Sequence, residues 1–426
     1  MNTKNRRWLL RKEPILNTII VFFMFAYLGV FNSYNRIIAF GILIVFIILL
    51  CFSKKHTLQI NRLAVIEDIL LLDIFLSALF RNGQTGWKYC SLLLLCIIIK
   101  YLNLNEESYI KVLIWIERIA LVFAVFTIIG FFYPYLIQRL FGFMLNENQV
   151  NALHRYATYN HGSAGLAGEL SYNAFCLSLG LISVLAKIAS ERRITAQSIL
   201  KLILLCAGIC LTTKRGQFLI MIVLLLLGLI IFYLKIGRKI SIRKLIIGIV
   251  LLSILFSTPA IYNFIKFNIL YEGGTTLQLS GRYYFWNIAI NMFKEHPILG
   301  NGINSFDIIY NYSKGISSAN FAGAHNSYLQ YLGEVGIVGL SLLIIVMISN
   351  LICTIKYVSQ DICLYLTVFS LLGQIMVILY CFSGNPLYQP QEIFTYFYFL
   401  SINQLMLRMY GRKKYENSPV RNCGTV

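Results

Sequence analysis

The polar residues best suited to chemistry lie in a long segment, 262–334, between two apolar runs of the chain. Apolar and aromatic residues at helical spacing predict a helix over 280–295, which Pro297 should end and which we expect along a membrane surface or on a helix bundle. Arg282 lies in its first turn, where the helix dipole disfavours a cation unless an anion is bound. The pattern therefore predicts a site for a phosphate-type anion; the alternative is a surface arginine that snorkels at a membrane interface.

A histidine lies further along the same segment, directly ahead of a second predicted helix. Ser327 and Gln330 have the spacing of a capping box, so we expect this helix to begin at Ser327. The positive end of the helix should keep His325 neutral and able to accept a proton; the alternative is a hydrogen-bonded structural histidine. The helix should continue into an apolar span along a stripe of three glycines that permits close helix contact, Gly333, Gly336 and Gly339.

Two shorter connections carry further charged candidates. Lys214 and Arg215 lie between two apolar spans, where Arg215 either pairs with a lipid phosphate or serves with Lys214 as an interfacial anchor. Glu169 lies at the start of another predicted span. It could be a plain helix N-terminal acid, a partner for an arginine or a contact for a sugar hydroxyl. Weaker candidates just before it are His154, Arg155 and His161.

Apolar runs make up most of the chain and must position these residues. Of the 426 residues, 58% are hydrophobic and 13% charged, which excludes an ordinary soluble enzyme. The ten cysteines include no CxxC pair and are expected to be packing residues. We predict an all-α bundle of about twelve transmembrane helices, without the related halves of many transporters. The predicted spans are 15–31, 37–52, 64–80, 89–103, 110–136, 169–188, 198–212, 217–234, 245–261, 335–356, 362–382 and 393–409.

Positive charge predicts how these spans are oriented. With the N-terminus in the cytoplasm, 25 of the 37 Lys and Arg residues fall on the cytoplasmic side and 11 outside. This bias predicts a multi-pass protein of the cytoplasmic membrane with both termini inside, and it explains the net charge of +20 without nucleic acid. The segments 137–168 and 262–334 then lie outside. We expect transmembrane helices 1–9 in 1–261, an extracytoplasmic loop with an amphipathic helix and His325 in 262–334, and helices 10–12 with a basic tail in 335–426.

Taken together, these motifs resemble the O-antigen ligase/polymerase superfamily, which includes Wzy-type repeat-unit polymerases. The resemblance covers residues 210–340 well and the first half of the chain mainly by topology. Two positions depart from the family pattern: Lys214 stands where the family often has serine, and Leu170 where many polymerases have proline after the glutamate. The family signature is met by His325-Asn326 with Gly336 and Gly339, by Arg215-Gly216, and by Gly281-Arg282 followed by Trp286.

The resemblance implies a membrane glycosyltransferase whose donor is a glycan on undecaprenyl pyrophosphate. Arg215 and Arg282 would bind the pyrophosphate and stabilise it as it leaves. His325 would take the proton from the acceptor sugar hydroxyl, a role that contributes typically ~10²–10⁴-fold. No cofactor is expected. The sequence contains no Asp-x-Asp motif, so it does not suggest a divalent-metal site. Inversion at the anomeric carbon is the simplest outcome of a direct displacement. Further contacts to glycan or acceptor would come from Lys214, Glu169, Arg155, Asn326 and Tyr328.

Within this resemblance we prefer a polymerase of lipid-linked repeat units, which builds O-antigen or capsule. The Ile-, Lys-, Asn- and Tyr-rich composition hints at an AT-rich genome and a Gram-positive capsule. The alternative activity is a ligase that moves polymer to a lipid A core. The alternatives from other classes are a flippase for the same lipid-linked unit, which would place polar residues near mid-bilayer, and a structural scaffold. Expected partners are the lipid-linked donor and acceptor, the bilayer, and a chain-length regulator and flippase.

Overall fold

The computed structural model describes residues 16–25, 62–81, 96, 104–141, 147–158, 162–236, 280–313 and 323–416. Its regular structure there is helical, with no strand among these residues, which confirms the predicted all-α class for this part of the chain. The helices are α3 (Arg62–Arg81), α5 (Glu106–Phe132), α6 (Leu136–Phe141), α7 (Glu147–Thr158), α8 (Leu170–Glu191), α9 (Ala196–Leu211), α10 (Arg215–Ile236), α12 (Ser280–Glu295), α13 (Phe306–Ser313), α14 (Ser327–Ser359), α15 (Leu364–Tyr380) and α16 (Pro390–Glu416), with 3-10 turns η2 (Gly165–Ala167) and η4 (Pro386–Tyr388).

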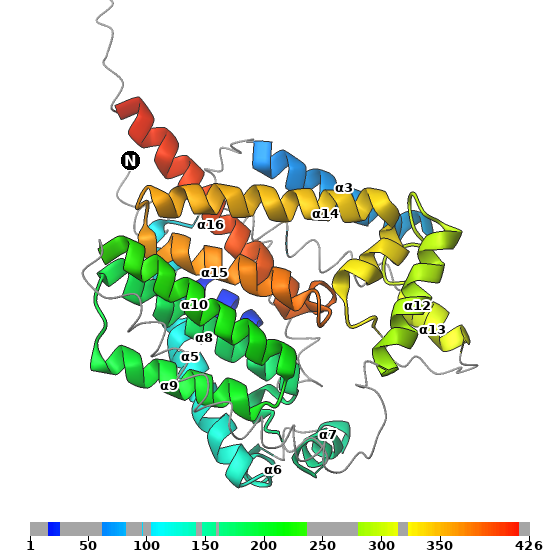
Figure 1. Ribbon diagram of the computed structural model, residues 1–426, viewed down its shortest axis with the longest axis horizontal. Coiled ribbons are helices and arrows are strands. Elements are labelled where there is room, and N and C mark those ends of the chain that lie inside the picture. The colour runs from blue at the N-terminus through cyan, green and yellow to red at the C-terminus, as the bar shows by residue number, and fades with distance from the viewer. Residues whose placement is uncertain are drawn as a thin grey trace, which may run out of the picture.

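Helix α8 forms the centre of the bundle and is buried on every face by α5, α9, α10 and α15. A helix that is apolar all round must be enclosed in this way. Glycines permit the close approach: a Cβ on Gly180 of α8 would lie 2.4 Å from Ala120 of α5, and one on Gly228 of α10 would lie 3.0 Å from Leu185 of α8. In Figure 1 these helices run across the view with α14, while α12 and α13 stand at the end where α14 begins.

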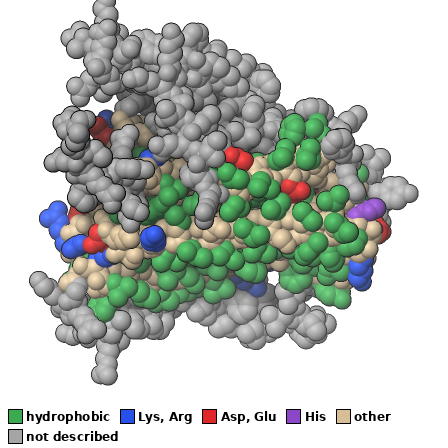
Figure 2. Space-filling view, turned by 90° about the horizontal axis from the view of Figure 1, so that it is seen from above, with side chains coloured by type: hydrophobic (Ala, Val, Ile, Leu, Met, Phe, Trp, Pro, Cys, Tyr) green, Lys and Arg blue, Asp and Glu red, His purple; other side chains and the backbone are tan. Residues whose placement is uncertain are grey.

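Among the residues that the structure describes, four helices are long and apolar enough to cross a membrane: α5, α8, α10 and α14. Shorter apolar helices cover Leu16–Phe25, α9 and α15. In Figure 2, hydrophobic side chains cover much of the described surface between the two ends of the bundle, and Lys and Arg side chains stand near both ends. Nine of the predicted spans coincide with described helices, whereas 37–52, 245–261 and nearly all of 89–103 lie outside the described residues. The full number of membrane crossings stays a prediction.

A chain of buried polar side chains joins α3, α14, α15 and α16 inside the bundle. Asn350 donates to Glu67 at 2.9 Å and receives a hydrogen bond from Asn403 at 3.0 Å. Thr354 donates to Asn403 at 2.8 Å and receives one from Gln374, also at 2.8 Å. Hydrogen bonds between helices fix their relative positions where the surroundings are otherwise apolar.

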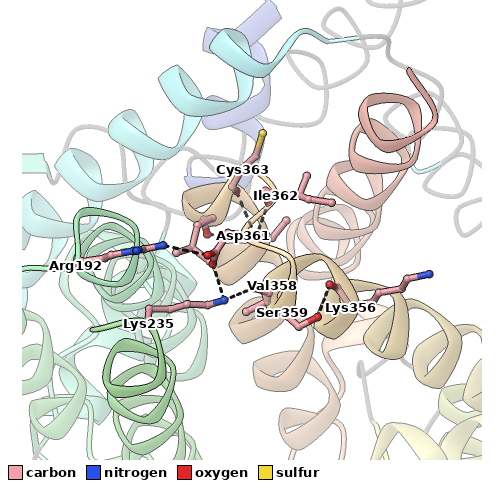
Figure 3. Close-up of polar contacts among 10 residues, drawn as sticks. Arg192, Lys235, Lys356, Val358, Ser359, Asp361, Ile362 and Cys363 are labelled. Carbon is pink, nitrogen blue, oxygen red and sulfur yellow. Dashed lines mark hydrogen bonds and ion pairs between the residues drawn. The ribbon is translucent and has the colours of Figure 1, made fainter. Parts of the chain in front are cut away.

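Asp361 ties three helices together at the end of the bundle remote from His325 (Figure 3). Its carboxylate pairs with Arg192 at the end of α8, at 3.0 Å, and with Lys235 at the end of α10, at 2.6 Å. Lys235 also donates to the carbonyl of Val358 at 2.6 Å, so it bridges α10 to the α14–α15 connection. Asp361 and Arg192 are substantially exposed, so the geometric link matters more than the small energy of such pairs.

Candidate functional site

His325 occupies a tight turn immediately before α14. Its φ of 51° lies in the left-handed region, which is uncommon for residues other than glycine. The residue keeps an exposed surface, and the Phe285 ring of α12 stands edge-on to the imidazole with 5.8 Å between centroids. Backbone strain of this kind persists only where neighbouring groups hold it, and such positions cluster at functional sites.

Both neighbours of His325 in the chain are held by hydrogen bonds. On one side, the Ala324 N–H donates to Gln330 Oε1 at 3.0 Å, and the Ala324 carbonyl accepts from Trp286 Nε1 at 3.1 Å. On the other side, the Ser327 N–H donates to the carbonyl of Cys381 at 2.8 Å. Asn326 Oδ1 accepts from the first turn of α14. The strained turn is therefore set by contacts from α12, α14 and the end of α15.

The charges around His325 favour its neutral form. Burial of part of the ring lowers the pKa of His325 first, and the positive charges of Arg282 and Lys214 lower it further, against an opposing effect of Glu169. Residues far apart in sequence, from α12, the α9–α10 turn and the start of α8, therefore act on one imidazole. A neutral imidazole can accept a proton, so the predicted chemistry of His325 is consistent with its surroundings.

The α9–α10 turn carries the basic pair and is joined to the segment before α8. The Ser163 N–H donates to the Leu211 carbonyl at 2.9 Å, and a Cβ on Gly162 would meet Thr213 Oγ1 at 2.6 Å. Of the basic pair, Lys214 is the one whose charge acts on His325. Arg215 begins α10 and its side chain is exposed. Lys214, for which the resemblance implied a lesser role than for Arg215, therefore has an electrostatic effect on His325.

Glu169 is the N-cap of α8. Its two carboxylate oxygens accept from the N–H groups of Ser171 at 3.1 Å and Tyr172 at 2.8 Å. The interpretation of Glu169 as a helix N-terminal acid is confirmed, and its charge also reaches His325. A carboxylate at this position compensates the positive end of the helix, whereas the first turns of α10 and α12 contain Arg215 and Arg282 and no acidic residue.

Helix α12 is confirmed over Ser280–Glu295 and packs on α14 rather than standing free. Gly333 of α14 permits this contact, since a Cβ there would lie 2.8 Å from the Ala289 carbonyl oxygen. Arg282, in the first turn of α12, is exposed, and its charge lowers the pKa of His325. The contact of helix α12 with the histidine is made by Phe285, in the next turn.

The expected continuous helix through the three glycines is wrong at Gly336, where φ is 67° and ψ is −167°. The break releases the carbonyls of Gly333 and Glu334, and these accept from the N–H groups of Asn301 at 3.1 Å and Gly302 at 2.7 Å. The turn that contains Gly300 and Gly302 is thus docked directly onto the broken helix. Gly339 remains a close-packing position, with Asp73 of α3 2.9 Å from where a Cβ would stand.

The capping box is also wrong in its chemistry, although α14 begins at Ser327 as predicted. The cap is Asn326, and the Gln330 side chain reaches back past it to Ala324. Ser327 instead donates its hydroxyl to the Gly384 carbonyl at 3.2 Å. A side-chain amide and a hydroxyl have several partners within reach at a helix start, and spacing alone does not choose among them.

The remaining candidates are spread more widely. Tyr328 turns away from the histidine and donates its hydroxyl to the Ile378 carbonyl of α15 at 2.9 Å. His154 of α7 stacks near Tyr135, with 5.0 Å between ring centroids. Arg155 lies within α7, but its side chain is outside the described part of the structure, as is His161. The segment 137–168, predicted as a loop, contains α6, α7 and η2.

Sequence analysis gave no role to Glu334, which is fully buried and has four hydrogen-bond donors around it. Its Oε1 accepts from the Phe306 N–H at 3.0 Å and from Gln330 Nε2 at 3.1 Å. Its Oε2 accepts from the Asn304 N–H and the Tyr388 hydroxyl, both at 2.8 Å. The sequence feature that could have indicated this role is the position of Glu334, an acidic residue between glycines at the start of an apolar span, where a buried carboxylate requires hydrogen-bond partners.

Residues 200–344 match a family model described as O-antigen ligase. The matched range runs from α9 into α14 and so contains Lys214, Arg215, Arg282 and His325, while Glu169 precedes it. The match is consistent with the superfamily resemblance seen in the motifs. A comparison with curated proteins gave no match. The apolar helices together with this family indicate a membrane protein.

Proposed function

From the match of residues 200–344 to O-antigen ligase, a family of membrane enzymes that transfer lipid-linked glycans, we propose that this protein polymerises undecaprenyl-pyrophosphate-linked repeat units. The reaction takes place on the outer face of the cytoplasmic membrane and extends a surface polysaccharide, either O-antigen or capsule. The observation that carries the proposal is His325, which is held in a strained turn and whose pKa is lowered by burial and by the charges of Arg282 and Lys214.

His325 acts as the general base. The acceptor sugar hydroxyl gives its proton to the imidazole as its oxygen attacks the anomeric carbon of the donor. A new glycosidic C–O bond forms, the bond from that carbon to the pyrophosphate oxygen breaks, and undecaprenyl pyrophosphate leaves with the electron pair. Direct displacement inverts the anomeric centre. The His325 side chain keeps an exposed surface at which the acceptor hydroxyl can approach the imidazole.

The leaving pyrophosphate binds at the helix ends that carry cations. Helix α10 begins with Arg215 after Lys214, and α12 has Arg282 in its first turn. Backbone N–H groups at a helix start and guanidinium groups both suit phosphate oxygens. Positive charge at these ends is unfavourable without an anion, and a bound pyrophosphate removes that cost. The same cations lower the pKa of His325, which couples leaving-group binding to the base.

The test is a purified full-length protein in liposomes with lipid-linked repeat units as the only glycan substrate. A polymerase yields a ladder of products that increase by one repeat mass each. A ligase yields product only when a lipid A core is added, and a flippase changes no product mass. Because the matched family model is described as O-antigen ligase, the arm with added lipid A core is the decisive comparison.

Variants locate the site in the same assay. His325→Ala, Arg282→Ala and Arg215→Ala should each abolish or strongly reduce the ladder. The matched controls are His296→Ala, an exposed histidine after α12, and Lys294→Ala, an exposed cation at the opposite end of α12. Full-length polymer from all three site variants at normal protein levels would overturn the site assignment.

A further inference from the structure

A series of hydrogen bonds connects Ala324, the residue before His325, through Gln330 to Glu334. Gln330 Oε1 accepts from the Ala324 N–H at 3.0 Å and from Asn385 Nδ2 at 2.9 Å. Gln330 Nε2 donates to Glu334 Oε1 at 3.1 Å. The side chains of Gln330 and Glu334 lie one helical turn apart on α14 and are both buried.

The direction of every hydrogen bond in this line is determined by its backbone ends. The N–H of Ala324 can only donate, so Gln330 must present its oxygen there and its amide nitrogen to Glu334. The N–H groups of Asn304 and Phe306 can also only donate, so Glu334 must accept at both oxygens. A glutamine in place of Glu334 would set an NH₂ group against a backbone N–H in either orientation.

Glu334 also joins two segments that flank the histidine turn. Asn304 lies in the connection between α12 and α13, Phe306 is the first residue of α13, and the Tyr388 hydroxyl comes from η4, before α16. Gln330 adds Asn385, which lies just before η4 in the connection between α15 and α16. The position of the Ala324 backbone thus depends on contacts from both sides of α14.

We propose that Gln330 and Glu334 are positioning residues that hold Ala324 and thereby set the direction in which His325 presents its imidazole. The inference rests on the proposed role of His325 as the base. It assigns to the pair no contact with substrate. Without the Gln330 oxygen, the Ala324 N–H loses its buried partner, and the left-handed turn at His325 is free to relax.

The consequence is measurable at His325 without any glycosyl transfer. Relaxation exposes more of the ring to water and carries it away from Arg282 and Lys214, so both causes that lower its pKa weaken. Diethyl pyrocarbonate reacts with neutral imidazole, and peptide mass spectrometry reports acylation of His325 specifically. The pH midpoint of this acylation gives the pKa in the folded full-length protein.

The experiment compares the wild type with Gln330→Met and with the control Gln374→Met. Gln374 is also a fully buried glutamine with side-chain partners, but it lies on α15 in the polar chain inside the bundle. We expect Gln330→Met to raise the midpoint for His325 and to lower the polymerisation rate by roughly 10–100-fold, as a small misplacement of a catalytic group does. Gln374→Met should leave the midpoint of His325 unchanged.

Glu334→Gln should shift the midpoint in the same direction, and the double variant Gln330→Met/Glu334→Gln should be no worse than the more severe single variant, because the pair acts as a unit. A wild-type midpoint in Gln330→Met would overturn the inference, as would an equal shift in Gln374→Met. An active His325→Ala enzyme with the expected midpoint shifts in the Gln330 variant would instead overturn the proposed function and leave the positioning itself established.

Discussion

Gly300 and Gly336 meet backbone to backbone, and this contact docks the segment after α12 onto α14. A Cβ on Gly336 would lie 2.7 Å from the Gly300 nitrogen, and one on Gly300 would lie 2.3 Å from the Glu334 carbonyl oxygen. Both glycines have positive φ, 68° at Gly300 and 67° at Gly336. Gly300 and Gly336 therefore allow the two backbones to come closer than any residue with a side chain would permit.

Gly336→Ala should sharply lower the thermal unfolding midpoint and the yield of folded protein. The substituted residue would combine a backbone conformation reserved for glycine with a clash against backbone atoms, which cannot move aside as a side chain can. The matched control is Gly168→Ala, where φ is also positive, at 73°, but nothing lies within 4 Å of the Cβ. That control should cost only the conformational strain, ~1 kcal/mol. Equal losses in both variants would contradict the close contact.

Lys214→Met should move the acid limb of the pH–activity profile to higher pH. The Lys214 charge disfavours the imidazolium, so its removal raises the pKa of His325, and the base is then protonated at a pH where the wild type is still active. Glu169→Gln should move the limb the other way, because the Glu169 charge raises the pKa of His325. Initial rates measured against pH in the reconstituted assay give both limbs; shifts of the same sign would be inconsistent with this electrostatic picture.

Two substitutions at Asn326 distinguish the effect of helix capping from the effect of charge on His325. Asn326→Ala removes the cap of α14 and should cost about 1 kcal/mol of stability. Asn326→Asp keeps the acceptor oxygen but places a carboxylate next to His325, which favours the imidazolium and so raises the pKa of His325. We expect near-normal unfolding of the Asp variant together with an acid limb displaced to higher pH. Thermal unfolding and rate profiles of the two variants test this, and an unshifted limb in the Asp variant would count against a base at His325.

The ion pair between Glu117 of α5 and Lys201 of α9 should matter for stability because both side chains are largely buried. Lys201→Met leaves the Glu117 carboxylate without its cation and should cost about 3 kcal/mol. Adding Glu117→Gln should recover most of that loss, since the uncompensated charge is gone. Arg192→Ala, at an exposed pair, should change stability by less than about 1 kcal/mol. Unfolding of these three variants and the wild type in one detergent makes the comparison, and a double variant no more stable than Lys201→Met would contradict it.

Sequence patterns predicted the helices better than the contacts between them. Apolar run length located α8 and α10, and the spacing around Pro297 located α12, because these signals depend on local residues alone. The break at Gly336 could not be predicted, since the carbonyls it frees find partners from a turn more than thirty residues earlier. The roles of Gln330 and Lys214 could not be predicted for the same reason, because their interactions depend on how segments distant in the sequence pack together.

The polar chain through Asn350 and Asn403 has a mechanical consequence for the helix bundle. If α16 slid along α14 by a single residue, Asn403 would lose its hydrogen bonds to Asn350 and Thr354 within an apolar interior, at a cost that rises with each bond broken. The bundle therefore resists shear. The helices α14 and α16 keep one register relative to each other.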